Sequence, residues 1–160
     1  MSSDHQRVAH ITLDEKSVVR RSADIEHEQK VAIFDLLDQN RFCICDKPDT
    51  GPYSLHLSIE ENRLIFDIRS EDDAATLLRL PLPVITFKRI IRDYFHICES
   101  YFDAIKTASP SKIEAIDMGR RGLHNEGTEL LLERLDGKIE TDFDTARRLF
   151  TLICVLHIRG

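Results

Sequence analysis

Residues 113–129 (IEAIDMGRRGLHNEGTE) bring together the side chains of this chain that are best suited to hold an anion. Their apolar positions recur at intervals of three and four residues, which predicts a helix. One flank of that helix carries a polar stripe whose successive members are four, three and four residues apart: Asp117, Arg121, His124 and Thr128. Arginine binds carboxylates and phosphates through paired hydrogen bonds. The stripe and the neighbouring Arg120 are therefore a candidate ligand-binding site.

Arg120 lies on the apolar face of the same helix, between Ile116 and Leu123. An unpaired guanidinium in such a place is strongly unfavourable, so Arg120 needs an acidic partner. The preceding helical segment offers Glu99 and Asp103. We predict that Arg120 is paired with protein groups rather than free in solvent.

The same segment also fits a purely structural role. Asp117 and Arg121 are four residues apart, which is the spacing of an ordinary ion pair along a helix. Each glycine in the segment destabilises a helix interior by up to about 1 kcal/mol, and close approach of a second helix would offset this cost. Two interpretations stay open: a structural ion network, or a pocket in which the two arginines and the histidine hold an anion.

Other groups of reactive residues are weaker candidates. Cys43 and Cys45 with His56 suggest zinc, but structural zinc sites use wider ligand spacing and a second ligand pair, so we predict no metal. Cys98 and Cys154 occupy apolar helical positions, where thiols are expected to be inert. The chain has no nucleophile elbow, P-loop, dinucleotide fingerprint or zinc-protease motif. No cofactor is predicted, and whether the protein is an enzyme stays open.

Composition limits the partners. The 160 residues carry 22 basic and 28 acidic side chains, a net charge of −6, which argues against nucleic acid. Basic pairs at residues 20–21, 88–89, 120–121 and 147–148 could form a local patch, although such pairs are commonly solvated faces. No apolar stretch approaches the ~20 residues of a membrane helix, and no signal core is visible. With four cysteines expected to stay reduced, we expect a cytoplasmic protein with no membrane role.

The order of the predicted elements indicates a single α+β domain over residues 1–160. Alternating apolar residues predict an N-terminal strand and then an antiparallel β meander that prolines end. Three- and four-residue periodicity predicts the helices. The predicted strands are 7–13, 42–44, 53–59, 64–69 and 76–80, and the predicted helices are 24–40, 84–107, 110–135 and 144–157. We expect about four helices to cover one face of the sheet.

The final helix, 144–157, is apolar around nearly its whole circumference. A helix of this kind is buried in a core or in an oligomer interface. Because the apolar pattern continues almost to the C-terminus, docking of the helix is expected. We predict a homodimer formed through this helix, since two-fold dimers are the most common assemblies. A monomer with the helix inside its core is the alternative.

Four runs of the chain resemble an uncharacterised family of small bacterial cytosolic proteins. They are GPYSLHLSIEENRLIFDI (51–68), KRIIRDYFHICESYFDAI (88–105), IEAIDMGRRGLHNEG (113–127) and DFDTARRLFTLICVLHIRG (142–160). The resemblance implies no activity, cofactor or catalytic residue. Our first hypothesis is a non-catalytic interaction or regulatory protein with an unidentified protein partner. The alternative is an enzyme or small-anion-binding protein that uses the helix 113–129.

Overall fold

Alternating apolar residues build a four-stranded sheet. The computed structural model describes residues 4–14 and 23–156. Strands β3 (Tyr53–Glu60), β4 (Arg63–Ser70) and β5 (Thr76–Pro83) form the expected antiparallel meander, and β1 (Val8–Leu13) pairs in parallel with β3. Glu61 and Asn62 connect β3 to β4 with positive φ angles of 51° and 62°, the backbone of a tight two-residue hairpin turn. The strand order is β1-β3-β4-β5.

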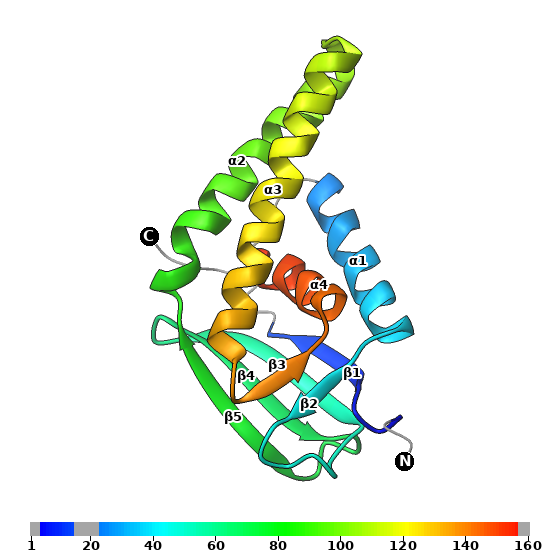
Figure 1. The fold of residues 1–160 in the computed structure, drawn as a ribbon, viewed down its shortest axis with the longest axis vertical. Helices are drawn as coiled ribbons and strands as arrows, with labels where there is room; N and C mark the ends of the chain where they lie inside the picture. The colour runs from blue at the N-terminus through cyan, green and yellow to red at the C-terminus, as the bar shows by residue number, and fades with distance from the viewer. Residues whose placement is uncertain (1–3, 15–22, 157–160) are drawn as a thin grey trace.

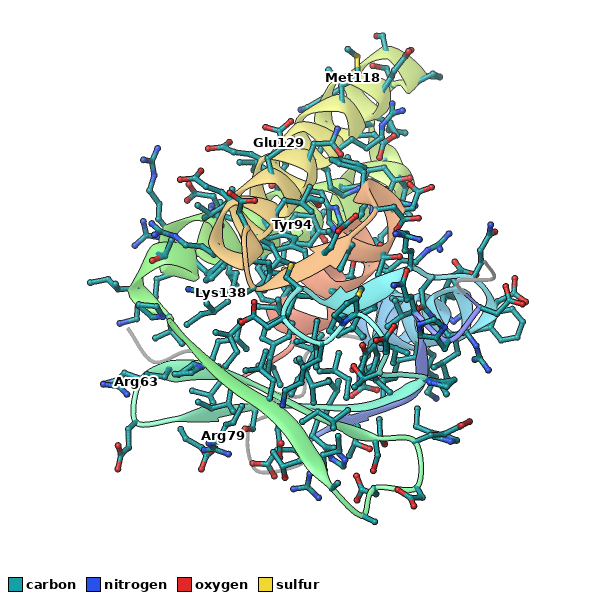
Figure 2. All side chains as sticks on the ribbon, turned by 60° about the horizontal axis from the view of Figure 1, so that its bottom comes forward. Arg63, Arg79, Tyr94, Met118, Glu129 and Lys138 are labelled. Atoms are coloured by element: carbon teal, nitrogen blue, oxygen red, sulfur yellow. The ribbon has the colours of Figure 1, made fainter. Side chains whose placement is uncertain are left out.

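The meander continues further than the prolines predict. Pro81 and Pro83 lie within β5 rather than after it. Because β5 is an edge strand, it tolerates residues that lack a backbone N–H. The sheet face turned away from the helices carries charged pairs such as Arg79 with Glu60, whose side chains are 2.6 Å apart. Figure 2 shows Arg63 and Arg79 on the side of the molecule opposite Met118.

All helices of the described chain lie on the other face of the sheet (Figure 1). They are α1 (Ala23–Asp38), α2 (Ile85–Thr107), α3 (Pro110–Leu135) and α4 (Phe143–Cys154). Phe87 of α2 and Phe150 of α4 are fully buried, as are Leu57 and Phe66 of the sheet. The α+β class and the coverage of one sheet face are as predicted. No helix of the described residues is long and apolar enough to cross a membrane.

Local capping sets the helix bounds. Ser109 accepts a hydrogen bond from Lys112 N, and Pro110 occupies the first turn, so α3 begins where predicted. The last helix, predicted to start at Asp144, begins one residue earlier, at Phe143. Asp142 caps it, because Asp142 Oδ1 accepts from Thr145 N at 2.9 Å, and Asp144 lies in the first turn. The predicted end at His157 lies outside the described residues.

A second, two-stranded sheet corrects the predicted placement of residues 42–44. Strand β2 (Phe42–Ile44) pairs antiparallel with β6 (Ile139–Thr141) and not with the meander. Strands of three residues are too short for an alternating pattern to show, and these two lie far apart in the sequence. The pair links the end of α1 to the start of α4.

Helix α4 is buried by its own chain. Leu149, Leu152 and Ile153 are completely inaccessible, and Val155 is 3% exposed. The helix packs against α1 and α3 above the sheet. The apolar circumference of α4 is thus explained within one chain. The homodimer through this helix stays a prediction.

Candidate functional site

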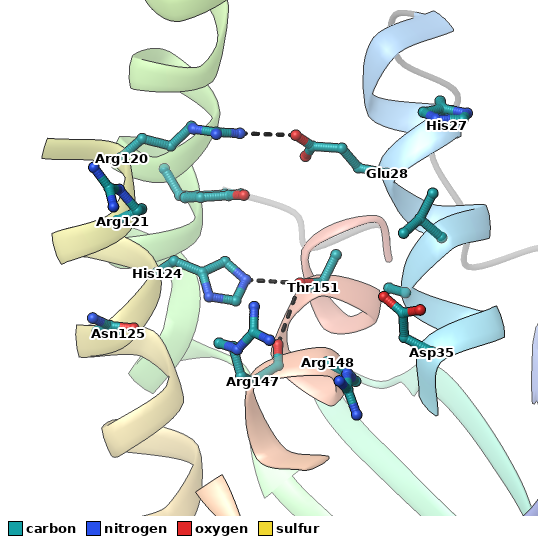
Figure 3. Close-up of a pocket in the computed structure, with 13 residues that line it drawn as sticks. His27, Glu28, Asp35, Arg120, Arg121, His124, Asn125, Arg147, Arg148 and Thr151 are labelled. Carbon is teal, nitrogen blue, oxygen red and sulfur yellow. Dashed lines mark hydrogen bonds and ion pairs between the residues drawn. The ribbon is translucent and has the colours of Figure 1, made fainter. Parts of the chain in front are cut away.

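Helices α1, α3 and α4 enclose a cleft of about 410 Å³. Arg120, Arg121 and His124 line it from α3, and Tyr94 reaches it from α2. The α4 side contributes Arg147, Arg148 and Thr151, and the α1 side contributes His27, Glu28 and Asp35. Figure 3 shows these groups around one space. Three of the five predicted ligand-binding residues therefore meet at one cleft.

A glycine allows α4 to approach α3 closely beside this cleft. A Cβ atom at Gly127 would overlap the ring of Phe150, which is fully buried. This contact explains one of the glycines in the segment by a crossing helix, as the structural interpretation expects. It also places Thr151, one residue after Phe150, against His124. At Gly122 no atom of the described chain lies within 4 Å of such a Cβ atom, so no contact there explains this glycine.

Arg120 joins three helices. Its Nη1 lies 2.8 Å from Glu28 Oε1 on α1, and its Nε and Nη2 lie 3.1 and 2.8 Å from Asp117 Oδ1 on α3. The guanidinium carbon lies 4.4 Å from the centre of the Tyr101 ring on α2. The predicted pairing of Arg120 is confirmed. The predicted partners on α2 are wrong, because α1 supplies the interhelical carboxylate and α2 supplies an aromatic face instead.

Asp117 orients both arginines of the segment. Arg121 Nε lies 3.2 Å from Asp117 Oδ2, which confirms the predicted i,i+4 pair. The Arg121 side chain is nonetheless 65% exposed. On α4, the side chain of Arg147 is 44% exposed, and its Nε forms a long ion pair of 3.8 Å with Asp144 Oδ1. Arg121 and Arg147 are thus loosely held and accessible to a ligand.

His124 lies between two aromatic rings at the cleft. The ring centres of Tyr94 and Phe150 are each 5.2 Å from that of His124. His124 Nε2 is 2.7 Å from Thr151 Oγ1, and that hydroxyl donates to Arg147 O at 3.2 Å. Since a hydroxyl has one proton, His124 Nε2–H is the donor to Thr151. Burial, with the charges of Arg147 and Arg120, lowers the pKa of His124 to about 4, so the ring is neutral at pH 7.

Thr128 does not line the cleft. Its side chain is fully buried, and its hydroxyl donates to His124 O at 2.8 Å. Helical spacing puts Thr128 on the polar stripe, but this end of α3 packs against α4, where Phe150 meets the neighbouring Gly127. The only hydroxyl proton of Thr128 is used within α3, so this residue supports the helix rather than a ligand.

Residues outside the predicted segment complete the cleft. The basic pairs 120–121 and 147–148 come together here. The sequence shows four basic pairs that could form a patch, but it does not show which of them meet. The pair 88–89 does not line the cleft, and 20–21 lies outside the described residues. The acidic groups of α1, Glu28 and Asp35, carry no signal in the sequence because they are ordinary polar positions of a surface helix.

The pKa values of Cys43, Cys45 and Cys98 are all raised, chiefly by burial, so these thiols are not activated. Burial raises the pKa of the Cys98 thiol to about 11, which disfavours the thiolate. Cys43 is buried, Cys45 is exposed, and His56 is 2.8 Å from Asp73 Oδ1. Within residues 4–14 and 23–156, no three His, Cys, Asp or Glu side chains are placed to hold a metal ion.

Comparison with known proteins decides the family. A family model described as "Uncharacterised protein family (UPF0262)" matches residues 5–159. The chain belongs to this family. A relative named "UPF0262 protein amb3341", from Paramagnetospirillum magneticum, is 63% identical over 155 residues, which is 97% of this chain and 98% of the relative. A UPF0262 protein of Azorhizobium caulinodans is 55% identical over 154 residues, 96% of this chain and 95% of the relative.

The resemblance to a bacterial family of uncharacterised proteins is thereby confirmed over nearly the whole chain. A third UPF0262 protein, from Erythrobacter litoralis, is 56% identical over 161 aligned positions. The names of these relatives state no activity. No solved structure matches the chain significantly. Any function must therefore be argued from the geometry of the cleft.

Proposed function

We propose that the protein is a non-catalytic binding protein for a small anion, and that the cleft between α1, α3 and α4 is its binding site. One observation carries this proposal: two separate arginine pairs, from α3 and α4, face one cleft of about 410 Å³. Ligand pockets usually have volumes of about 300–1,000 Å³. Arginines at such a site hold carboxylates or phosphates with defined geometry.

The charge distribution supports an anionic ligand. The whole chain has a net charge of −6, yet four arginines and two carboxylates line the cleft. Arg121 and Arg147 have weak ion pairs and large exposed fractions, so an anion can replace their solvent contacts. Helix surfaces on several sides of the anion reduce solvent screening, which strengthens these interactions relative to an open surface.

The protonation state of His124 favours binding over acid–base catalysis. A general base works best when its pKa lies near the working pH. With a pKa of about 4 and its Nε2–H engaged by Thr151, His124 is a poor proton acceptor near neutral pH. Its hydrogen bond to Thr151 is better suited to hold α3 and α4 together at the wall of the cleft.

A regulatory role in the cytoplasm is part of the same proposal. Cys43, Cys45 and Cys98 are thiols that form no disulfide within the described chain, as is usual for proteins of a reducing compartment. Helix α1 forms one wall of the cleft and exposes Phe34 on its outer side, with 71% of that residue accessible. A ligand that contacts α1 could therefore alter a surface that is open to a protein partner.

The test is isothermal titration calorimetry with pyrophosphate and citrate at constant ionic strength. Arg147→Gln removes one exposed charge from the cleft, and Arg92→Gln removes one from α2, where Arg92 is 77% exposed and does not line the cleft. We expect saturable binding of at least one anion that Arg147→Gln weakens by about tenfold, which corresponds to about 1.4 kcal/mol. Arg92→Gln should leave it unchanged. Equal weakening by both variants, or no saturable binding, would contradict the proposal.

A further inference from the structure

The α1 wall of the cleft carries a carboxylate that has no partner among the described residues. Asp35 is half-buried, lines the cleft, and its carboxylate makes no hydrogen bond or ion pair with any described residue. Figure 3 shows Asp35 directed from α1 towards the space in front of α4. The other carboxylate of this wall, Glu28, is 2.8 Å from Arg120 and is already neutralised. The two acidic groups of the wall are therefore not equivalent.

The opposite walls hold the positive charges. Arg121 on α3 and Arg147 on α4 are accessible, and Arg148 Nε is buried without a hydrogen-bond partner within the described chain. A simple anion bound to these arginines would lie in the same small cleft as the Asp35 carboxylate. Like charges at close range are unfavourable where solvent screening is reduced. A purely anionic ligand would thus leave Asp35 uncompensated.

We infer that the ligand is dipolar: an anionic group, phosphate or carboxylate, faces the arginines of α3 and α4, and a protonated amine faces Asp35 on α1. This inference rests on the proposed anion-binding function and specifies its ligand class. An ammonium group supplies the three donors that a bare carboxylate can accept. The ligand then matches the charge of each wall.

The rest of the α1 wall indicates a short carbon body between the two charges. Val31 and Ala32 line the cleft one helical turn before Asp35, so an apolar surface lies beside the carboxylate. The volume of about 410 Å³ is towards the small end of the usual range for ligand pockets, about 300–1,000 Å³. Small phosphorylated amines and amino-acid-like compounds fit this description.

A matched set of three probes tests the inference. Phosphoethanolamine carries both charges, ethyl phosphate lacks only the ammonium group, and ethylamine lacks the phosphate. Their affinities can be compared by NMR titration of the backbone amides at constant ionic strength and pH 7. We expect phosphoethanolamine to bind about tenfold more tightly than ethyl phosphate, and ethylamine to bind weakest.

Two variants locate the effect. Asp35→Asn keeps the shape of the side chain and removes no hydrogen bond or ion pair with a described residue, so the variant should fold like the parent. Asp38→Asn makes the same charge change at an exposed position of α1 outside the cleft. We expect Asp35→Asn to abolish the preference for phosphoethanolamine and to tighten the binding of ethyl phosphate, because the carboxylate that repels that anion is removed. Asp38→Asn should retain the preference.

The possible failures are distinguishable. Equal affinities of the two phosphates for the parent would overturn the dipolar ligand and leave anion binding intact. A preference that survives in Asp35→Asn would remove the role assigned to Asp35. If none of phosphoethanolamine, ethyl phosphate, pyrophosphate and citrate binds saturably, the proposed function itself fails, and the dipolar ligand with it.

Discussion

Replacing Arg120 by alanine is the most direct test of how the cleft is held together. The substitution removes hydrogen bonds to Glu28 and Asp117 and the contact with the Tyr101 ring. It leaves Glu28 without the guanidinium that joins α1 to α3. Asp117 loses less, because Arg121 remains 3.2 Å away.

The expected destabilisation follows from the burial of the partners. Fully exposed ion pairs contribute about 0–1 kcal/mol. The side chains of Arg120, Glu28 and Asp117 are only 21%, 30% and 25% exposed, so their pairs should exceed that range. A cation–π contact adds about 0.5–1 kcal/mol. We expect Arg120→Ala to lower the free energy of unfolding by about 2 kcal/mol, against the ~0.5 kcal/mol typical of surface substitutions.

Urea unfolding followed by circular dichroism measures this free energy. For a chain of this size, about 2 kcal/mol corresponds to a fall of roughly 4–8 °C in Tm. Arg121→Ala is the matched control, because it removes the adjacent arginine, which is 65% exposed and contacts the same Asp117. We expect the control to change the free energy by about 0.5 kcal/mol or less.

A double-mutant cycle separates the ion pair from packing. Arg120→Ala combined with Glu28→Gln should show a coupling energy of about 1 kcal/mol. An unfolding midpoint of Arg120→Ala equal to that of the parent would refute the reasoning. Destabilisation without coupling to Glu28 would show that Arg120 acts through Tyr101 and Asp117 rather than by joining α1 to α3.

The other predictions concern packing and protonation. Gly127→Ala should lower the free energy of unfolding by about 1–2 kcal/mol in urea, because overlap with Phe150 outweighs the helix propensity of alanine, and a stabilised variant would contradict this. For His124, the folded pKa of about 4 lies below the usual histidine value of about 6.5, so its contribution to stability is complete above pH 6.5 and is lost as the pH falls towards 4. NMR titration of the ring should show protonation only near the lower value, and a midpoint above pH 6 would exclude this environment. Val155→Glu, the substitution that would dissociate a dimer formed through α4, should instead unfold the protein, since Val155 is 3% exposed within its own chain. Circular dichroism with light scattering distinguishes the outcomes. A folded monomeric variant from a dimeric parent would contradict this expectation and support the dimer interface through α4.

Elements with strong local signals could be predicted from the sequence. Ser109-Pro110 and Asp136-Gly137 bound α3 within one residue, because capping depends on neighbouring residues alone. Alternating residues in 53–59 and 64–69 place two strands of the meander for the same reason. Arg120 could be recognised as a paired residue from its helical face, since burying an unpaired charge is unfavourable wherever the partner comes from.

Features that depend on long-range contacts could not be predicted. The interhelical partner of Arg120 is Glu28, and nothing near Glu28 in the sequence distinguishes it from other acids of α1. The pairing of β2 with β6 joins segments that are too short for periodicity to reveal. Thr128 fits the spacing of the polar stripe, but its burial depends on where α4 crosses α3.

The β2–β6 pair has a mechanical consequence for the cleft. It links α1 and α4 at one end, where Arg41 N also donates to Thr145 Oγ1 at 2.9 Å. Near the other end, α1 meets α3 through the Glu28–Arg120 ion pair. Salt weakens ion pairs, less where they are partly buried, but it does not compete with the backbone hydrogen bonds of a strand pair. Raising the ionic strength should therefore speed hydrogen exchange in the half of α1 around Glu28 and leave the amides of β2 protected.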